Sequence, residues 1–122
     1  MRFLYYPKCT TCRRAKACLD AQKVKYEAQD LVSNPPTAAE LKTWHQASGL
    51  PLTRFFNTSG RKYRALGLAE QRKTMTEDEQ YDLLASDGML IKRPILISDS
   101  GQVILGFQEA EYHALLKKLA SR

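Results

Sequence analysis

Two cysteines separated by two residues, Cys9 and Cys12, lie between a short apolar segment and an amphipathic one. Residues 2–6 are apolar and aromatic and are followed by Pro7, which predicts a buried strand. Residues 10–22 carry apolar side chains near one face and basic ones on the other, which predicts a helix. The CxxC pair is therefore expected at the amino-terminal end of a helix that directly follows a strand.

The next segments continue this pattern. Residues 24–31 alternate in polarity, which predicts a half-buried strand. The resulting strand–helix–strand unit of about 30 residues has the size of a right-handed parallel crossover. Two threonine–glutamate capping boxes, at 37–40 and 76–79, each predict the start of a helix. We therefore expect a helical middle from about residue 37 to residue 88.

The last third of the chain predicts a hairpin and a helix. Residues 94–98 form a short apolar strand, 99–101 (Asp-Ser-Gly) a hairpin turn, and 103–105 its return strand. Residues 109–119 then have the pattern of a closing helix. The order βαβ, helical insertion, ββα predicts one α/β domain over residues 1–122, with a thioredoxin-like fold and a four-stranded mixed sheet.

Composition limits where such a chain works. Hydrophobic residues make up 43% and charged residues 26% of the sequence, the balance of an ordinary soluble protein. No run of about 18 apolar residues indicates a membrane helix, and the first residues lack the apolar stretch of a signal peptide. The three cysteines crowd into residues 9–18, unlike a disulfide framework. We expect a cytoplasmic monomer that makes no contact with a membrane.

The charge balance is basic, with 19 Lys and Arg against 13 Asp and Glu, a formal net charge of +6. Such an excess favours anionic ligands, acidic partner surfaces or weak nucleic-acid contact. No basic run exceeds two residues, so the sequence carries no strong signal for direct nucleic-acid binding. A solvated basic surface and a specific anionic partner both remain open.

The position of the CxxC pair has a chemical consequence. Free amide groups and the dipole at a helix start stabilise a thiolate, which lowers the pKa of the first cysteine below about 8.5. Lys8 and Arg13 add positive charge nearby. Cys12, one turn into the helix, is placed to attack a mixed disulfide on Cys9. We therefore predict Cys9 as the catalytic nucleophile and Cys12 as the catalytic resolving thiol.

Two other interpretations of the pair stay open. A zinc site needs four ligands, whereas this chain offers one pair, a helical Cys18 and two distant histidines, so we expect no metal. The cysteines could also be small apolar residues at the start of a helix. Cys18 lies on the apolar face of its helix, and we predict that it is a core residue.

Arg93 and Pro94 precede the third predicted strand. In thioredoxin-like folds a proline at this place is commonly cis and faces the dithiol. An arginine beside it can bind an oxyanion or a sulfenate as a bidentate donor. The alternative is that Pro94 begins a strand and Arg93 is solvated. The substrate- or anion-binding set that we predict comprises Lys8, Thr10, Thr11, Arg13, Arg93 and Pro94.

Four segments (6–15, 55–60, 83–88 and 92–95) resemble the bacterial arsenate reductase-like family, which includes glutaredoxin-coupled arsenate reductases and the Spx/MgsR transcription regulators. The resemblance covers essentially the whole chain. It implies a thioredoxin-like fold with a helical insertion and a thiol–disulfide oxidoreductase without a bound cofactor. Glutathione, glutaredoxin or thioredoxin would supply electrons, and a small oxyanion or a protein disulfide would be the substrate.

The enzyme branch of that family has one nucleophilic cysteine, matched by Cys9, and several arginines that clamp arsenate. Arg93 matches one of them. A second arginine would fall near residues 105–107, where the sequence has neither Lys nor Arg. At the position of a third arginine this sequence has Asn57, with Arg54 close by. Fewer clamps predict weaker oxyanion binding.

The regulator branch has a redox CxxC that matches Cys9 and Cys12, and an arginine equivalent to Arg93. Its members bind the C-terminal domain of the RNA polymerase α-subunit and use the dithiol as a sensor. Residues 55–68 look more like other arsenate reductase-like proteins than like the regulators. A redox-sensing regulator is therefore the alternative to an enzyme.

Overall fold

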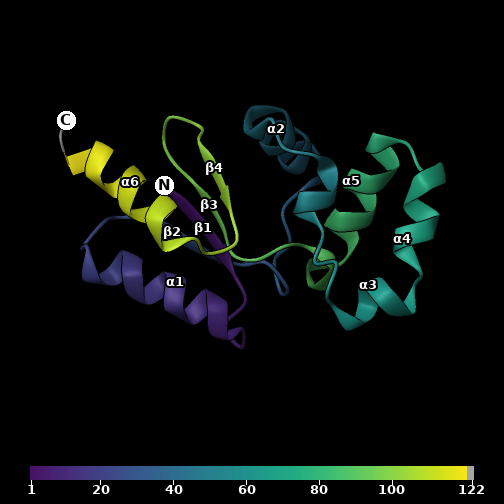
Figure 1. The fold of residues 1–122 in the computed structure, drawn as a ribbon, viewed down its shortest axis with the longest axis horizontal. Helices are drawn as coiled ribbons and strands as arrows, with labels where there is room; N and C mark the ends of the chain where they lie inside the picture. The colour runs from purple at the N-terminus through teal and green to yellow at the C-terminus, as the bar shows by residue number, and fades with distance from the viewer. Residues whose placement is uncertain (121–122) are drawn as a thin grey trace.

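The computed structural model describes residues 1–120 and contains a four-stranded mixed sheet in the order β2-β1-β3-β4 (Figure 1). Strand β1 pairs parallel with β2 and antiparallel with β3, and β3 pairs antiparallel with β4. The strands are β1 (Arg2–Tyr5), β2 (Glu27–Asp30), β3 (Ile95–Ile97) and β4 (Val103–Leu105). This topology confirms the thioredoxin-like sheet predicted from the sequence.

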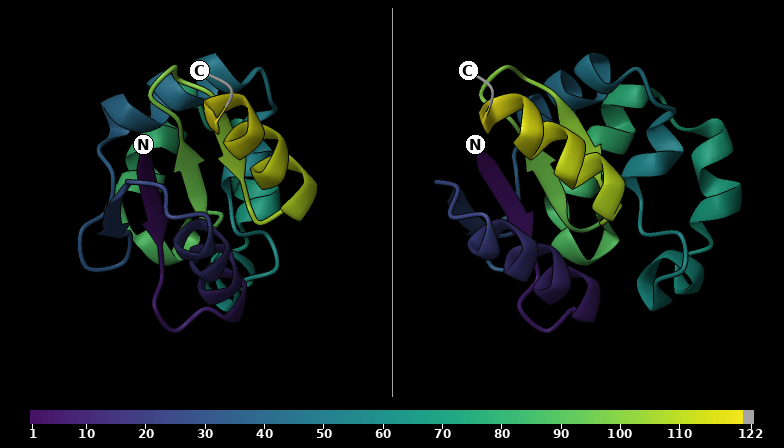
Figure 2. Two further views of the ribbon diagram at one scale, coloured as in Figure 1. Left: turned by 90° about the vertical axis from the view of Figure 1, so that its left-hand side faces the viewer. Right: turned by 60° about the vertical axis from the view of Figure 1, so that its left-hand side comes forward.

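Helices cover both faces of the sheet (Figures 1 and 2). The α-helices are α1 (Thr10–Ala21), α2 (Ala38–Ser48), α3 (Arg61–Ala65), α4 (Leu68–Gln71), α5 (Glu77–Ser86) and α6 (Glu109–Ala120), and the short 3₁₀ helices are η1 (Leu52–Phe55), η2 (Arg72–Thr74) and η3 (Gly88–Leu90). Helices α1 and α6 lie on one face, and the insertion that contains α2 to α5 lies on the other. None of the helices formed by residues 1–120 is long and apolar enough to cross a membrane.

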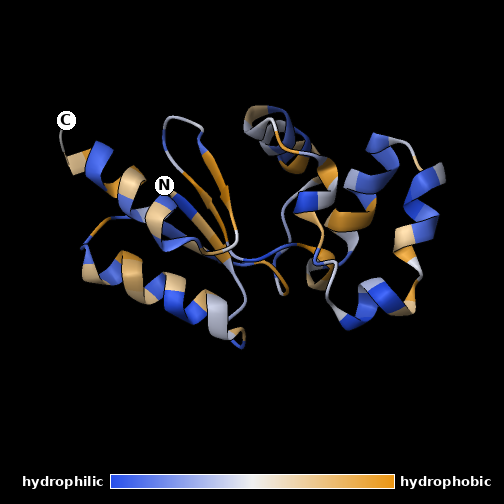
Figure 3. Cartoon of the chain, in the orientation of Figure 1, coloured by the Kyte–Doolittle hydropathy of each residue, from blue (hydrophilic) through white to orange (hydrophobic). Residues whose placement is uncertain are grey.

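The alternation of side chains along the strands divides the core into two clusters. Phe3 of β1 and Leu96 of β3 pack with α1 and α6, whereas their neighbours Leu4 and Ile95 pack with the insertion. Successive residues of a strand point to opposite faces of its sheet, so β1 and β3 each contribute side chains to both clusters. In the hydropathy colouring β3 and β4 are mostly orange (Figure 3).

The helices of the insertion begin where the sequence predicts. Thr37 accepts a hydrogen bond from the Glu40 backbone N–H at 3.1 Å, and the Glu40 carboxylate accepts one from the Thr37 N–H at 3.0 Å. Thr76 and Glu79 repeat this arrangement at 3.1 Å and 2.9 Å. Both capping boxes are thereby confirmed, since each satisfies two amide groups that a helix start leaves without partners.

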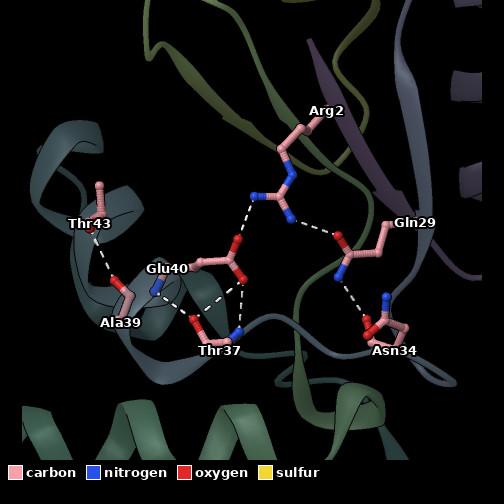
Figure 4. Close-up of polar contacts among 7 residues, drawn as sticks. All are labelled: Arg2, Gln29, Asn34, Thr37, Ala39, Glu40 and Thr43. Atoms are coloured by element: carbon pink, nitrogen blue, oxygen red, sulfur yellow. Dashed lines mark hydrogen bonds and ion pairs between the residues drawn. The ribbon is translucent and has the colours of Figure 1, made fainter.

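Arg2 fastens the start of α2 to the sheet (Figure 4). Its guanidinium forms an ion pair with Glu40 and donates a hydrogen bond to Gln29 on β2 at 2.6 Å. It also lies 5.1 Å from the ring centroid of Trp44. Glu40 therefore caps α2 and at the same time binds β1, which sets the position of the insertion against the sheet.

The end of the insertion packs tightly against the sheet at Gly88. A Cβ atom on this residue would lie 1.8 Å from the carbonyl oxygen of Leu31, just after β2. Asp87 accepts a hydrogen bond from the Met89 N–H at 2.9 Å and so starts η3. A side chain at position 88 would force these two segments apart.

The second strand is shorter than the alternation over 24–31 predicts. Its partner β1 has four residues, and pairing runs from Arg2 opposite Glu27 to Tyr5 opposite Asp30. Val24 and Tyr26 still pack against the cluster under α1 and α6, although they lie outside the strand. The alternating pattern therefore matches the burial of Val24 and Tyr26 but not that of Ala28, which is exposed, and the length of the strand depends on its pairing with β1.

Candidate active site

Cys9 and Cys12 differ in their exposure although they lie one turn apart. Cys9 is the N-cap residue of α1 and is half-buried, whereas Cys12 is completely buried. The Cys9 N–H donates to the Tyr6 carbonyl at 2.9 Å, which closes the turn between β1 and α1. The Cys12 sulfur accepts a hydrogen bond from the Tyr6 N–H at 3.4 Å. One sulfur is thus accessible, and the other lies beneath it.

The surroundings also separate the acidities of the two thiols. Burial acts to raise the pKa of Cys9, but the backbone N–H and thiol of Cys12 together with the Arg93 guanidinium outweigh it, and the pKa is lowered. Burial, with the Cys9 sulfur adding to it, raises the pKa of Cys12 to about 12 despite the Tyr6 N–H. Since the thiolate is the nucleophile, Cys9 is the sulfur prepared to attack.

Cys9 faces a cavity of about 320 Å³. Three cationic side chains line it, Arg54, Lys92 and Arg93, and no carboxylate among the described residues does so. The other lining residues are Cys9, Thr11, Asn57, Ser59, Leu105, Gly106, Phe107 and Gln108. A cavity with a nucleophilic sulfur and uncompensated positive charge attracts anions or disulfides that carry negative groups.

Backbone hydrogen bonds bring the walls of this cavity together. In the insertion, the Asn57 N–H donates to Leu90 O at 2.8 Å, and the Lys92 N–H donates to Phe55 O at 2.8 Å. The Gly106 N–H then donates to Pro94 O at 2.8 Å. These bonds join the segment 54–57, the approach to β3 and the end of β4, although the three are far apart in the sequence.

Arg93 has few partners for its guanidinium. Its ring contact with Tyr6 spans 5.4 Å, and its Nη1 donates to Met89 O at a long 3.5 Å. Its Nε is buried and has no hydrogen-bond partner among residues 1–120. A buried donor without a partner is costly, so the side chain keeps capacity for a ligand that brings acceptors.

Lys92 is the cation that the sequence argument missed. Its Cε lies 3.2 Å from the place that a Cβ of Gly106 would occupy, and Gly106 has a φ of +73°. The side chain therefore passes over a glycine in the region 105–107, where the resemblance implied an arginine. The positive charge is present there, but it comes from Lys92, in the segment that leads into β3. The hairpin predicted from the sequence sets residue 94 opposite residue 106, and this register could have indicated that Lys92 lies beside Gly106.

The structure brings some predicted residues together and leaves others apart. Cys9, Thr11 and Arg93 line the cavity, whereas Lys8, Thr10 and Arg13 are exposed outside it. The Arg13 Nε donates to Pro7 O at 2.9 Å. Pro94 is buried, and its peptide bond with Arg93 is cis.

The third cysteine, Cys18, lies away from the Cys9 cavity. Cys18, which we predicted as a core residue, is half-buried and packs against the cluster under α1 and α6. All three thiols are free in the structure. Within the described chain no three His, Cys, Asp or Glu side chains converge as metal ligands would.

A CxxC pair between the first strand and first helix of a four-stranded mixed sheet defines a thioredoxin-like protein. Within that class the chain belongs to the ArsC family, whose sequence model matches residues 4–115. The fold, the helical insertion and this match agree with the resemblance drawn from the sequence.

Three relatives illustrate the range of the family. YusI of Bacillus subtilis (strain 168) is 49% identical over 92% of this chain and 94% of its own length. A structure described as a possible arsenate reductase from Streptococcus mutans UA159 is 50% identical, with a TM-score of 0.86 over 93% of this chain and 95% of that one. The regulatory protein MgsR of Bacillus subtilis (strain 168) is 30% identical over 97% of this chain and 91% of its own.

Proposed function

We propose that this protein is a thiol–disulfide oxidoreductase in which Cys9 is the nucleophile and Cys12 the resolving thiol. The observation that carries the proposal is the asymmetry of the pair: Cys9 lines a cavity with three cations, and Cys12 is buried behind it. The compartment is the cytoplasm, where thiols are kept reduced.

The reaction has two exchange steps. The Cys9 thiolate attacks a substrate disulfide, a Cys9–sulfur bond forms, the substrate S–S bond breaks, and the leaving thiolate takes a proton from solvent. Cys12 then gives up its proton and attacks the Cys9 sulfur, which forms a Cys9–Cys12 disulfide and releases the second substrate thiol. Two electrons pass from the protein dithiol to the substrate, and glutathione, glutaredoxin or thioredoxin returns them.

In this proposal Arg93 and Lys92 also allow the cavity to bind an anionic substrate. They would hold the negative end of a substrate near Cys9, and a small oxyanion such as arsenate is one candidate. The possible arsenate reductase at 50% identity supports testing that ion directly. With arsenate, the Cys9 sulfur would bond to arsenic, one As–O bond would break, and the oxygen would leave as water after protonation.

The test compares Cys9→Ser with Cys12→Ser in a disulfide- or arsenate-dependent assay that follows NADPH oxidation through a coupled reductase. Cys9→Ser should abolish turnover with either substrate. Cys12→Ser should accumulate a mixed disulfide on Cys9 that intact-mass spectrometry detects when a disulfide is the substrate. Full turnover in Cys9→Ser together with loss in Cys12→Ser would overturn the assignment of roles.

A redox-sensing regulator is the second candidate, favoured by the 30% identity to the regulatory protein MgsR. In this case the dithiol would switch binding to the C-terminal domain of the RNA polymerase α-subunit without turnover. Binding of that purified domain, measured with the protein reduced and then oxidised by diamide, tests the idea. Equal absence of binding in both states would remove this candidate.

A further inference from the structure

A second hollow, of about 440 Å³, adjoins the Cys9 cavity. The two share Asn57, Ser59 and Arg93 as lining residues, so they lie on either side of these residues and next to one another. The second hollow is otherwise lined by Gly60, Arg61, Lys62, Arg64 and Met89. It leads from the reactive sulfur toward α3.

The positions of the helices agree with this arrangement. The amino-terminal end of α1 and the helix α3 lie along the same edge of the molecule, with η3 between them (Figure 1). The ribbon of α3 is largely hydrophilic (Figure 3). An extended substrate bound at Cys9 can therefore continue along this edge without leaving the protein surface.

The charge of the second hollow is one-sided. Four cationic side chains line it, Arg93 and three that belong to α3, and no carboxylate among the described residues lines either hollow. With Arg54 and Lys92 of the Cys9 cavity, six cations line the two hollows, and of these only Lys62 forms an ion pair among the described residues. Such a concentration of one sign produces a field that a scattered basic surface does not.

Two of the three cations of α3 are held in place, and one is open. Lys62 forms an ion pair with Asp87, and an Arg64 Nη2 donates to Ser59 O at 2.9 Å. Arg61 is exposed and has no polar partner in the part of the chain that the structure describes. Arg61 and the remaining donors of Arg64 are therefore available to carboxylates of a ligand.

We propose that the second hollow binds acidic residues next to the disulfide of a peptide or protein, so that the substrate is a disulfide flanked by carboxylates. This inference rests on the proposed function, because it names the substrate of Cys9. The Cys9 thiolate attacks the peptide sulfur, the peptide S–S bond breaks, and the carboxylates on Arg61 and Arg64 orient that sulfur. The gain comes from charge complementarity and is therefore screened by salt.

The experiment uses peptides of one sequence whose cysteine carries a 2-pyridyl disulfide, with two neighbouring positions as Glu, Gln or Lys. The leaving 2-thiopyridone is neutral, so only the charge of the peptide changes. Its release gives the second-order rate constant for attack by Cys9. At low ionic strength we expect the Glu peptide to react about tenfold faster than the Gln peptide and the Lys peptide to be slowest.

Variants locate the effect. Arg61→Gln should reduce the Glu-to-Gln rate ratio several-fold, whereas Lys117→Gln, which removes one charge from α6, should leave the ratio unchanged. Equal rates for the Glu and Gln peptides, or equal ratios in the two variants, would overturn the acidic subsite while leaving exchange at Cys9 intact. If no peptide reacts with the wild-type protein at Cys9, the proposed function itself fails.

Discussion

Lys92 lies across Gly106, because a Cβ on the glycine would sit 3.2 Å from the Lys92 Cε. The glycine backbone has a positive φ of +73°, and its lack of a side chain leaves room for the lysine to reach the Cys9 cavity. The position of the Lys92 ammonium group thus depends on the absence of a side chain at Gly106.

Gly106→Ala should therefore displace Lys92. We expect a loss of about 1 kcal/mol of stability from the positive φ, and a several-fold drop in the preference of Cys9 for an anionic disulfide (Ellman's reagent) over a neutral one (2,2′-dithiodipyridine). Gly101→Ala is the control, because this residue has a φ of +92° but no heavy atom within 4 Å of the place that its Cβ would take. An identical preference in both variants would contradict the role of Lys92.

Arg93 should add to the lowering of the Cys9 pKa that the hydrogen bonds from Cys12 begin. The thiolate is the reactive form, and the lowered pKa of Cys9 moves its alkylation by iodoacetamide to lower pH than for an ordinary thiol. Arg93→Gln removes the guanidinium that favours the thiolate, so the midpoint of the pH–rate profile should rise. Peptide mass spectrometry resolves Cys9 from the other cysteines. Lys117→Gln should keep the wild-type midpoint, and an unchanged midpoint in Arg93→Gln would refute the assignment.

Gly88 should tolerate no side chain. A Cβ would meet the Leu31 carbonyl oxygen at 1.8 Å, a contact that requires the insertion to move away from the sheet. We expect Gly88→Ala to cost more than about 3 kcal/mol in urea unfolding. Gly67→Ala, with a φ of +63° and open space around it, should cost about 1 kcal/mol. Comparable losses in the two variants would show that the insertion adjusts easily.

The substitution Tyr112→Phe should stabilise the folded protein. Its ring is fully buried on α6, and its hydroxyl has no hydrogen-bond partner among residues 1–120. Removal of a buried, unpaired hydroxyl should raise the free energy of unfolding by about 1 kcal/mol. Tyr63→Phe is the opposite case, because the Tyr63 hydroxyl accepts a hydrogen bond from Arg72 at 3.1 Å and its loss should destabilise. Destabilisation in both variants would mean that the Tyr112 hydroxyl is paired in solution.

The elements with local signals were predictable from the sequence. The two capping boxes and the turn at 99–101 each act within four residues, so their side-chain chemistry decides the local structure. The CxxC pair was placed correctly at the start of α1 for the same reason. The length of β2 was not, since pairing with β1 determines it.

The thiols and Arg93 were predicted for the site, whereas Lys92 was missed and Arg54 was noted only as a neighbour of Asn57. Arg54 and Lys92 are brought to the cavity by backbone hydrogen bonds between residues 55–57 and 90–92, a pairing that leaves no periodic trace in the sequence. Only the register of the predicted hairpin, with 94 opposite 106, points to Lys92. Lys8 and Arg13 adjoin the cysteines in the sequence yet lie outside the cavity. Neighbours in sequence at a helix start spread around its axis, and only some of them face the same side.

The Cys9 cavity takes one wall from the end of α1 and another from the insertion, which α2 and Gly88 hold against the sheet. A local opening that frees the insertion would leave both cysteines in place but withdraw Arg54, and it would break the hydrogen bonds that hold residues 90–92, next to Arg93, against residues 55–57. The pKa of Cys9 would then move toward that of an ordinary thiol. The alkylation rate of Cys9 thus reports whether the insertion is packed against the sheet. Any ligand that stabilises this packing would also lower the pKa of Cys9 and increase its reactivity.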